Sequence, residues 1–257
     1  MIEIHSVTLP ELTGGEERRL YVYLPEAALD EPERRFPVLY MFDGHNVFFD
    51  EDATYGKSWG LGEYLDEHET PLIVAAVECN HHPDHGRIIE YAPFDFTARP
   101  YGSVKGRGKD TMDWIVNELK PRLDASYPTL PDREHTFIAG SSMGGLMSLY
   151  ALTAYNYVFS RAAALSPSLE FDGVGLRRLI ESAPIAPDTV LYMDYGEREW
   201  GWAKSASRRF GATVSRLLRR GVRVTARVVP EGEHCEASWE RQIPFFIPTL
   251  LYGLEDA

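Results

Sequence analysis

The chain has 257 residues, 44% of them hydrophobic and 25% charged, so it can bury the core of one α/β domain. Its formal net charge of −13 argues against nucleic-acid binding, which needs a basic face, and against a membrane-surface role. No apolar stretch is long enough to cross a bilayer and no signal-peptide pattern is visible, which favours a cytoplasmic protein. The two cysteines, Cys79 and Cys235, are expected as reduced thiols, with a single disulfide between them as the alternative.

The first half of the chain predicts two paired strands, followed by strands that alternate with helices. Residues 2–9 and 18–24 are expected to form antiparallel strands joined by a Gly-Gly turn. The later elements are buried strands at 37–42 and 72–77 and helices at 61–69 and 110–127. Pro121 should kink or end the last helix. Residues 78–108 are predicted to be a long irregular stretch, and loops of that length in compact domains usually have a function.

The second half continues the alternation. Strands are expected at 135–139, 162–165, 189–194 and 222–229, and helices at 146–155, 174–182 and 203–220, with a final helix from Glu236 that Pro244 and Pro248 interrupt. Strands that alternate with helices over the whole length indicate the α/β class, with a mostly parallel sheet and helices on both faces. No internal repeat or linker is visible, so residues 1–257 are predicted to form a single domain.

A Gly-x-Ser-x-Gly pattern, from Gly140 to Gly144, lies between a buried strand and an apolar helix. Small residues are needed there because the turn after the strand is very tight. The hydroxyl of Ser142 would then stand at the carboxyl edge of the sheet, and the following helix supplies orphan N–H groups and a positive dipole end. This context is typical of the nucleophile elbow of the α/β-hydrolase fold.

A nucleophilic serine needs a base, usually a histidine that a carboxylate orients. Of the eight histidines only His234 follows Ser142, and it comes shortly after the last predicted strand. In the α/β-hydrolase fold the acid lies between the nucleophile and the base in the chain. The candidates, which spacing alone does not separate, are Asp172, Asp194, Glu197 and Glu199.

An oxyanion hole needs two N–H donors, one from the residue after the nucleophile and one from the loop after an earlier strand. The first donor is expected to be the backbone of Met143. The second is expected in the turn 43–46, where His45 would donate through its backbone while its imidazole need not take part. An ordinary Asp-Gly turn is the alternative interpretation.

Further motifs accompany the elbow between about residue 20 and residue 251. They are 40–48 with its Asp-Gly-His-Asn turn, Ser58-Trp59, Arg87 with 90–93, 118–121, 165–168, 196–199, and 232–234 with Trp239. This ordered set resembles the esterase D-like putative esterase family of the α/β-hydrolase superfamily. The family includes enterobactin esterases, feruloyl and acetylxylan esterases, S-formylglutathione hydrolases and mycolyl transferases.

The resemblance implies Ser142 as nucleophile and His234 as base. In the family the acid follows a Gly-x-x-Asp/Glu pattern, which here lands on Glu199. The resemblance also implies oxyanion donors at Met143 and His45. Many members carry Gln or Leu at the position of His45, and this departure implies a changed pocket.

These residues favour a serine carboxylic-ester hydrolase that forms an acyl-enzyme, acts on a small-molecule ester and uses no cofactor. An acyltransferase that moves the acyl group to a sugar or another alcohol is the alternative. The loop 78–85 also carries Cys79, His81, His82 and His85, side chains that could bind zinc. Their spacing fits no standard structural zinc site, so no metal is predicted.

Aromatic and basic residues near the predicted site are candidate substrate contacts. Trp59, Tyr91 and Trp200 could form a platform for a sugar or phenolic ring, and packing in the core explains a tryptophan equally well. Arg87 could bind a carboxylate or phenolate, or it could pair with Glu90. The acyl group, the alcohol and the oligomeric state do not follow from the sequence.

Overall fold

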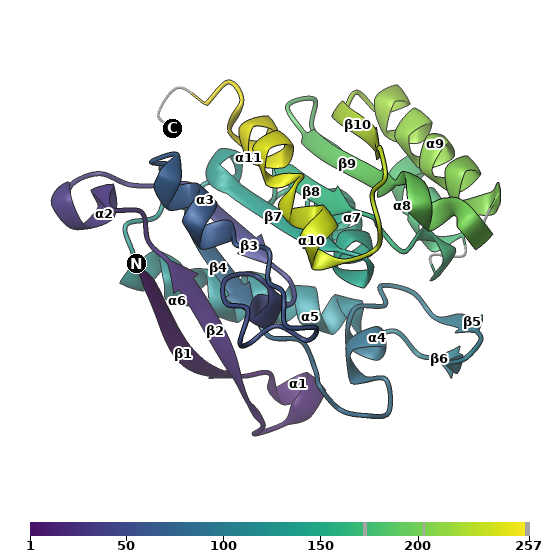
Figure 1. Cartoon of the computed structure of the whole chain (residues 1–257), viewed down its shortest axis with the longest axis horizontal. Coiled ribbons are helices and arrows are strands. Elements are labelled where there is room, and N and C mark those ends of the chain that lie inside the picture. Colours follow the sequence, from purple (N-terminus) through teal and green to yellow (C-terminus); the bar gives the residue numbers. More distant parts are fainter. Residues whose placement is uncertain (172–173, 203, 255–257) are drawn as a thin grey trace.

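A mixed β-sheet runs through the protein and has helices on both faces (Figure 1). The computed structural model describes residues 1–171, 174–202 and 204–254, and within these ranges it describes all side chains except those of residues 200–202 and 204. The eight-stranded sheet has the order β1-β2-β4-β3-β7-β8-β9-β10. Its strands are β1 (Ile2–Thr8), β2 (Glu17–Tyr23), β3 (Val38–Met41), β4 (Ile73–Val77), β7 (Thr136–Ser141), β8 (Arg161–Leu165), β9 (Val190–Gly196) and β10 (Arg223–Val229).

The direction of the strands follows the predicted pattern. Strand β2 is antiparallel to both β1 and β4, whereas the neighbouring pairs β4–β3, β3–β7, β7–β8, β8–β9 and β9–β10 are all parallel. The prediction of a mostly parallel α/β sheet is therefore confirmed. In a parallel sheet all carboxyl ends meet at one edge, and this edge is where ligands bind in open α/β folds.

Two sets of helices cover the two faces of the sheet, and each encloses its own cluster of buried apolar side chains. One face carries α3 (Leu61–Glu67), α10 (Glu236–Glu240) and α11 (Ile243–Leu251), and the other carries α5 (Gly108–Trp114), α6 (Lys120–Ser126), α7 (Met143–Ala154), α8 (Gly175–Ser182) and α9 (Lys204–Arg219). Three short helices lie in connections: α1 (Pro10–Thr13), α2 (Ala27–Asp30) and α4 (Gly86–Glu90). Among the described helices, none combines the length and apolar character that a membrane span requires.

Strand β7 illustrates why the central strands are apolar along their whole length. Successive side chains of a strand point to opposite faces of the sheet. Phe137 and Ala139 belong to the cluster under α3 and α11, whereas Ile138 belongs to the cluster under α7. Because helices cover both faces, all six residues of β7 are buried. The strand leads directly through Ser142 into α7, which places the predicted elbow at the carboxyl edge.

The stretch 78–108 differs from the prediction because it is not irregular throughout. It contains α4 and an antiparallel hairpin of β5 (Phe96–Ala98) and β6 (Gly102–Val104). The helix has five residues and each strand has three. Elements of this length are too short for hydrophobic periodicity to reveal them.

The predicted helix 110–127 is continuous but not uniformly α-helical. A π-helical turn, η2 (Ile115–Leu119), joins α5 to α6, and Pro121 is the second residue of α6. Proline has no N–H, and its ring displaces the carbonyl group four residues earlier. The wider π-turn directly before Pro121 accommodates that displacement, so the helical path continues past the proline.

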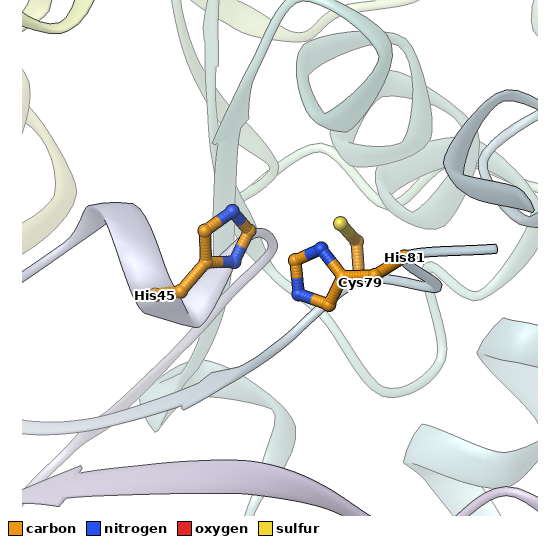
Figure 2. A group of neighbouring side chains, drawn as sticks. All are labelled: His45, Cys79 and His81. Carbon is orange, nitrogen blue, oxygen red and sulfur yellow. The ribbon is translucent and has the colours of Figure 1, made fainter. Parts of the chain in front are cut away.

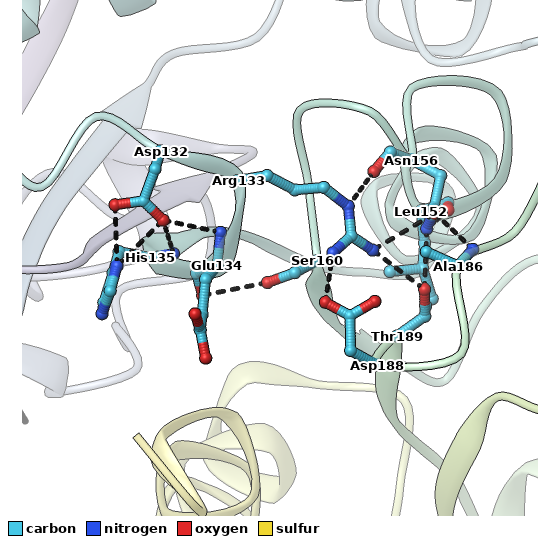
Figure 3. Close-up of polar contacts among 10 residues, drawn as sticks. All are labelled: Asp132, Arg133, Glu134, His135, Leu152, Asn156, Ser160, Ala186, Asp188 and Thr189. Atoms are coloured by element: carbon cyan, nitrogen blue, oxygen red, sulfur yellow. Dashed lines mark hydrogen bonds and ion pairs between the residues drawn. The ribbon is translucent and has the colours of Figure 1, made fainter. Parts of the chain in front are cut away.

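Polar contacts connect the loops at the amino edge of the sheet, away from Ser142 (Figure 3). Arg133, which precedes β7, pairs with Asp188 and donates from Nη2 to Asn156 Oδ1 at 3.2 Å. The same Nη2 donates to Thr189 Oγ1 at 3.1 Å, and Asn156 Nδ2 donates to that hydroxyl at 2.9 Å. Since these residues come from the loops before β7, β8 and β9, the contacts fix the amino ends of three neighbouring strands relative to one another.

A buried ion pair joins β2 to α4. Arg18 Nη1 lies 2.8 Å from Glu90 Oε1, and both side chains are only 2–3% exposed. Arg18 also donates to Thr13 Oγ1 and to the carbonyl oxygen of Glu78. Desolvating two charges is costly, so this pair is more important as a constraint on where α4 sits than as a net source of stability.

We expect Glu90→Ala to lower the free energy of unfolding by about 3–5 kcal/mol, because it leaves the Arg18 guanidinium buried without a counter-charge. The double variant Arg18→Met/Glu90→Leu should lose less than the single variant, since it removes both charges. Urea denaturation measures both. The control is Glu31→Ala, which breaks the exposed pair of Glu31 with Arg34 and should cost at most about 1 kcal/mol. An equal, small loss for Glu90→Ala and Glu31→Ala would contradict the prediction.

Candidate active site

Ser142 has a strained backbone conformation between β7 and α7. Its φ of 58° and ψ of −119° are unfavourable for any residue with a side chain. Three backbone hydrogen bonds hold it: its N–H donates to Leu165 at 2.9 Å, and its carbonyl accepts from Leu146 and Ser168 at 3.0 Å each. A Cβ at Gly140 would lie 2.8 Å from the carbonyl carbon of Gly144, so only glycine allows the helix to begin so close to the strand.

His234 and Glu199 meet at the same edge, from the loops after β10 and β9. His234 Nδ1 lies 2.8 Å from Glu199 Oε2. The other oxygen, Oε1, accepts hydrogen bonds from the N–H of Gly196 at 2.9 Å and from Ser166 Oγ at 2.6 Å. The side chain of Glu199 is 3% exposed, whereas that of His234 is 46% exposed. The carboxylate favours a proton on Nδ1, which leaves Nε2 as the basic nitrogen.

Asp194 and Glu197, two other candidate acids, have hydrogen-bond partners other than His234. Asp194 accepts from the N–H of Ser166 and from the hydroxyl of Tyr192, both at 3.0 Å. Its burial raises the pKa of Asp194 to about 7. Glu197 accepts from the N–H of Glu231 at 3.0 Å in an exposed loop. Asp172 lies outside the described residues.

A cavity of about 330 Å³ contains both Ser142 and His234 in its wall. The hydroxyl of Ser142 lies 3.2 Å from Ser168 Oγ, and among the described residues this contact is its side-chain hydrogen bond. Hydrogen bonds between nucleophile and base are often long before substrate binds, so a shared cavity wall is the relevant geometry here.

The turn after β3 lies beside the elbow and forms the 3₁₀ turn η1 (Gly44–Asn46). Asp43 precedes it in a left-handed conformation, with a φ of 58°. Arg87 holds Asp43 through two contacts, Nε to Oδ1 at 2.6 Å and Nη2 to Oδ2 at 2.7 Å. Burial acts to raise the pKa of Asp43, but the Arg87 guanidinium outweighs this effect and holds the pKa below its usual value.

Both predicted oxyanion donors lie at the start of a helical segment. Met143 is the first residue of α7, and His45 is in η1. The first N–H groups of a helix have no partner within the helix, so they are available to an oxyanion. The imidazole of His45 is buried, and burial lowers its pKa.

The residues predicted to contact the substrate do not all lie in the cavity wall. Trp59 is 3% exposed and packs against Trp239, and Tyr91 is 2% exposed and packs against Phe42, so both rings lie in the core behind the cavity wall. Arg87 does line the cavity, but its ion pair is with Asp43. The alternative expectation, that Arg87 pairs with Glu90, is wrong, because Glu90 pairs with Arg18. The side chain of Trp200 lies outside the described part of the structure.

Sequence reasoning assigned no role to three side chains that support this site. Ser168 contacts the hydroxyl of Ser142, and Ser166 donates to Glu199. Trp239 donates from Nε1 to Ser166 Oγ at 3.0 Å, and its ring lies 5.1 Å from that of His234. The available signal was position, since 166–168 directly follow the carboxyl end of a predicted strand.

The sheet order, the elbow after β7 and the Glu199–His234 contact at the same edge define the α/β-hydrolase class. A family model described as "Putative esterase" matches residues 12–244. The chain belongs to this esterase family and is a carboxylic-ester hydrolase.

Individual relatives are more distant. The "Uncharacterized protein YbbA" of Bacillus subtilis is 22% identical over 195 residues, which are 75% of this chain and 72% of the relative. An IroE-like serine hydrolase from Shewanella oneidensis superposes with a TM-score of 0.71 and 20% identity, covering 93% of this chain and 76% of the other. The siderophore hydrolase EstA from Aspergillus nidulans has a TM-score of 0.68 and 17% identity, with 95% and 93% covered. At these identities the two solved structures establish the fold.

The loops that carry Glu199 and His234 touch through glycines. A Cβ at Gly196 would lie 2.5 Å from the carbonyl oxygen of Gly232 and 2.6 Å from Glu199 Oε1. We therefore expect Gly196→Ala to displace the carboxylate and to lower kcat/KM for p-nitrophenyl acetate by about 10²-fold, the usual effect of a displacement near 1 Å. The measurement is steady-state kinetics, with circular dichroism to confirm folding.

The matched control is Gly211→Ala in α9, where an added Cβ meets nothing within 4 Å. This variant should keep its kcat/KM and gain up to about 1 kcal/mol of stability, because alanine is the better helix former. Unchanged kcat/KM in a folded Gly196→Ala variant would show that the contact does not position the acid.

Proposed function

We propose that this esterase cleaves small carboxylic esters through an acyl-enzyme on Ser142, with His234 as general base and Glu199 as the residue that orients it. The observation that carries the proposal is the 2.8 Å contact between Glu199 and His234, at a cavity that also contains the serine of the elbow. The order of nucleophile, acid and base along the chain agrees with this reading.

In the first half of the reaction, His234 Nε2 accepts the proton of the Ser142 hydroxyl while Oγ attacks the ester carbonyl carbon. The negative charge that develops on the carbonyl oxygen is stabilised by the N–H groups of Met143 and His45, and each such donor contributes about 3–4 kcal/mol in comparable enzymes. The C–O bond to the alcohol then breaks, and the imidazolium gives its proton to the leaving oxygen.

In the second half, water attacks the acyl-enzyme with His234 again as base, and the acid is released. Glu199 is suited to stabilise the imidazolium because Ser166 and the backbone of Gly196 hold its Oε1 while its Oε2 faces Nδ1. A carboxylate fixed in this way needs no reorganisation when the positive charge forms on His234.

Replacing the nucleophile tests the proposal directly. Ser142→Ala should lower kcat/KM for p-nitrophenyl acetate by about 10⁴-fold or more, because the covalent route is lost. The fold should be unaffected. Ser141→Ala is the matched control, since this neighbouring serine also lines the cavity, and it should keep most of the activity. A fluorophosphonate should modify the wild type once, at Ser142 by peptide mass spectrometry. Full activity in Ser142→Ala would refute the assignment.

The choice of acid is tested by comparing two isosteric variants. Glu199→Gln should lower kcat/KM by about 10²–10⁴-fold, because an amide cannot stabilise the imidazolium. Asp194→Asn should stay within about tenfold of the wild type. Its carboxyl group contacts Ser166 and Tyr192, and with a pKa of about 7 it is already partly neutral near neutral pH. Equal losses in the two variants would overturn the assignment of Glu199.

Hydrolysis and acyl transfer differ only in what attacks the acyl-enzyme. Adding glycerol or a sugar at increasing concentration separates them, since a transferase forms the new ester in proportion to acceptor and a hydrolase forms mainly the free acid. The cavity wall includes polar side chains such as Asn46, Thr54 and Asn80, which favours a small or polar ester over a long aliphatic one. A panel of acetyl-xylan, feruloyl, siderophore-lactone and S-formylglutathione substrates would identify the natural class.

A further inference from the structure

Two histidines and one cysteine converge on one wall of the catalytic cavity. His45 comes from η1, and Cys79 and His81 come from the loop after β4, two residues apart in the chain. One ligand atom from each of the three lies within 4.8 Å of the others. Figure 2 shows the imidazole rings of His45 and His81 side by side, in an edge-to-face arrangement, with the sulfur of Cys79 close to the His81 ring. We call these three residues the N₂S cluster.

The buried imidazole of His45 provides a second, independent observation. The residue is 4% exposed, and its Nδ1 has no hydrogen-bond partner among the described residues. Leaving a buried polar nitrogen unsatisfied costs about 1–3 kcal/mol. The other nitrogen, Nε2, lies 3.0 Å from Thr54 Oγ1. A metal-binding histidine has this arrangement, with one nitrogen on the metal and the other held by a second hydrogen-bonding group.

Two imidazole nitrogens and one thiolate form a ligand set typical of Zn²⁺ and other late first-row divalent cations. In a tetrahedral zinc site with Zn–N distances of about 2.0–2.1 Å and a Zn–S distance of about 2.3 Å, these ligand atoms lie about 3.3–3.6 Å apart. Because the ligand atoms lie within 4.8 Å of one another, the cluster has to contract by at most roughly 1.5 Å to reach this geometry. His81 is exposed and can supply this movement by rotating its side chain, while His45 and Cys79 are buried and already placed.

We propose that the N₂S cluster binds one Zn²⁺ ion, with the fourth coordination position open to the catalytic cavity. All three residues line the cavity that also contains Ser142 and His234, so a water or a polar group of a ligand can take that position. The site differs from the zinc-binding loop considered from the sequence. His82 Nδ1 accepts the N–H of Asp84 at 3.2 Å, and His85 packs against Tyr101.

The test is zinc binding by the whole protein, independent of its activity. Chelator-treated protein should bind one equivalent of ZnCl₂ in isothermal titration calorimetry, and the metal content should be one per chain after gel filtration. Cys79→Ala and His81→Ala should each weaken binding by at least about 100-fold, more than the loss usually seen when a supporting residue is removed. His82→Ala is the matched control and should bind as the wild type does.

Cobalt substitution adds a readout that is specific for the thiolate. The Co²⁺-loaded wild type and His82→Ala should show a sulfur-to-cobalt charge-transfer band, which Cys79→Ala should lack. Thermal unfolding of each metal-free variant checks that it is folded. If the buried substitution Cys79→Ala destabilises the protein, the exposed substitution His81→Ala still tests the site. Binding that survives His81→Ala, or no binding by the wild type, would overturn the proposal.

Discussion

The contact between the loops after β9 and β10 is the constraint on which the geometry of the proposed triad depends. The parallel pairing of β9 with β10 ends at the pair Gly196–Val229, so the two loops begin at the same edge of the sheet and next to one another. The N–H of Arg198 donates to the carbonyl of Gly232 at 2.9 Å, which joins the loops directly beyond the strands. Exposed ion pairs of Arg198 with Glu231 and Glu233 add little energy individually, but they restrict the same movement. The Glu199–His234 distance follows from this arrangement.

Beneath that contact, Ser166 connects two carboxylates that have different tasks. Its N–H donates to Asp194, and its hydroxyl donates to Glu199 while accepting from Trp239. Ser166 has a positive φ of 43°, so its backbone turns sharply enough to present both groups. Asp194 thereby fixes the loop after β8, and Glu199 is left with one oxygen for His234. Because β8 lies between β7 and β9, the same loop also carries Ser168 to the hydroxyl of Ser142.

The sequence was most informative where chain order and local pattern decide the structure. The elbow follows from a buried strand, small residues and a helix, and His234 follows from being the one histidine after Ser142. The choice between Asp194 and Glu199 needs the direction in which each side chain leaves the end of β9, and spacing does not encode that direction. Trp59 and Tyr91 were ambiguous for a similar reason, since burial depends on partners distant in the chain. The assignment of residues 1–257 to a single domain stays a prediction.

His45 shows how one residue can serve two sites through different atoms. Its backbone N–H is directed by the η1 turn, which the Asp43–Arg87 pair holds against the elbow. Its imidazole is independent of that N–H and lies in the wall of the cavity. The ring lies beside His81, and its Nδ1 has no hydrogen-bond partner among the described residues. A cation held by the imidazole would therefore sit beside the proposed oxyanion position without using the N–H that we propose as an oxyanion donor. Since η1 is shared, any shift of the turn on metal binding would change the oxyanion hole as well, which couples the two sites through a single backbone segment.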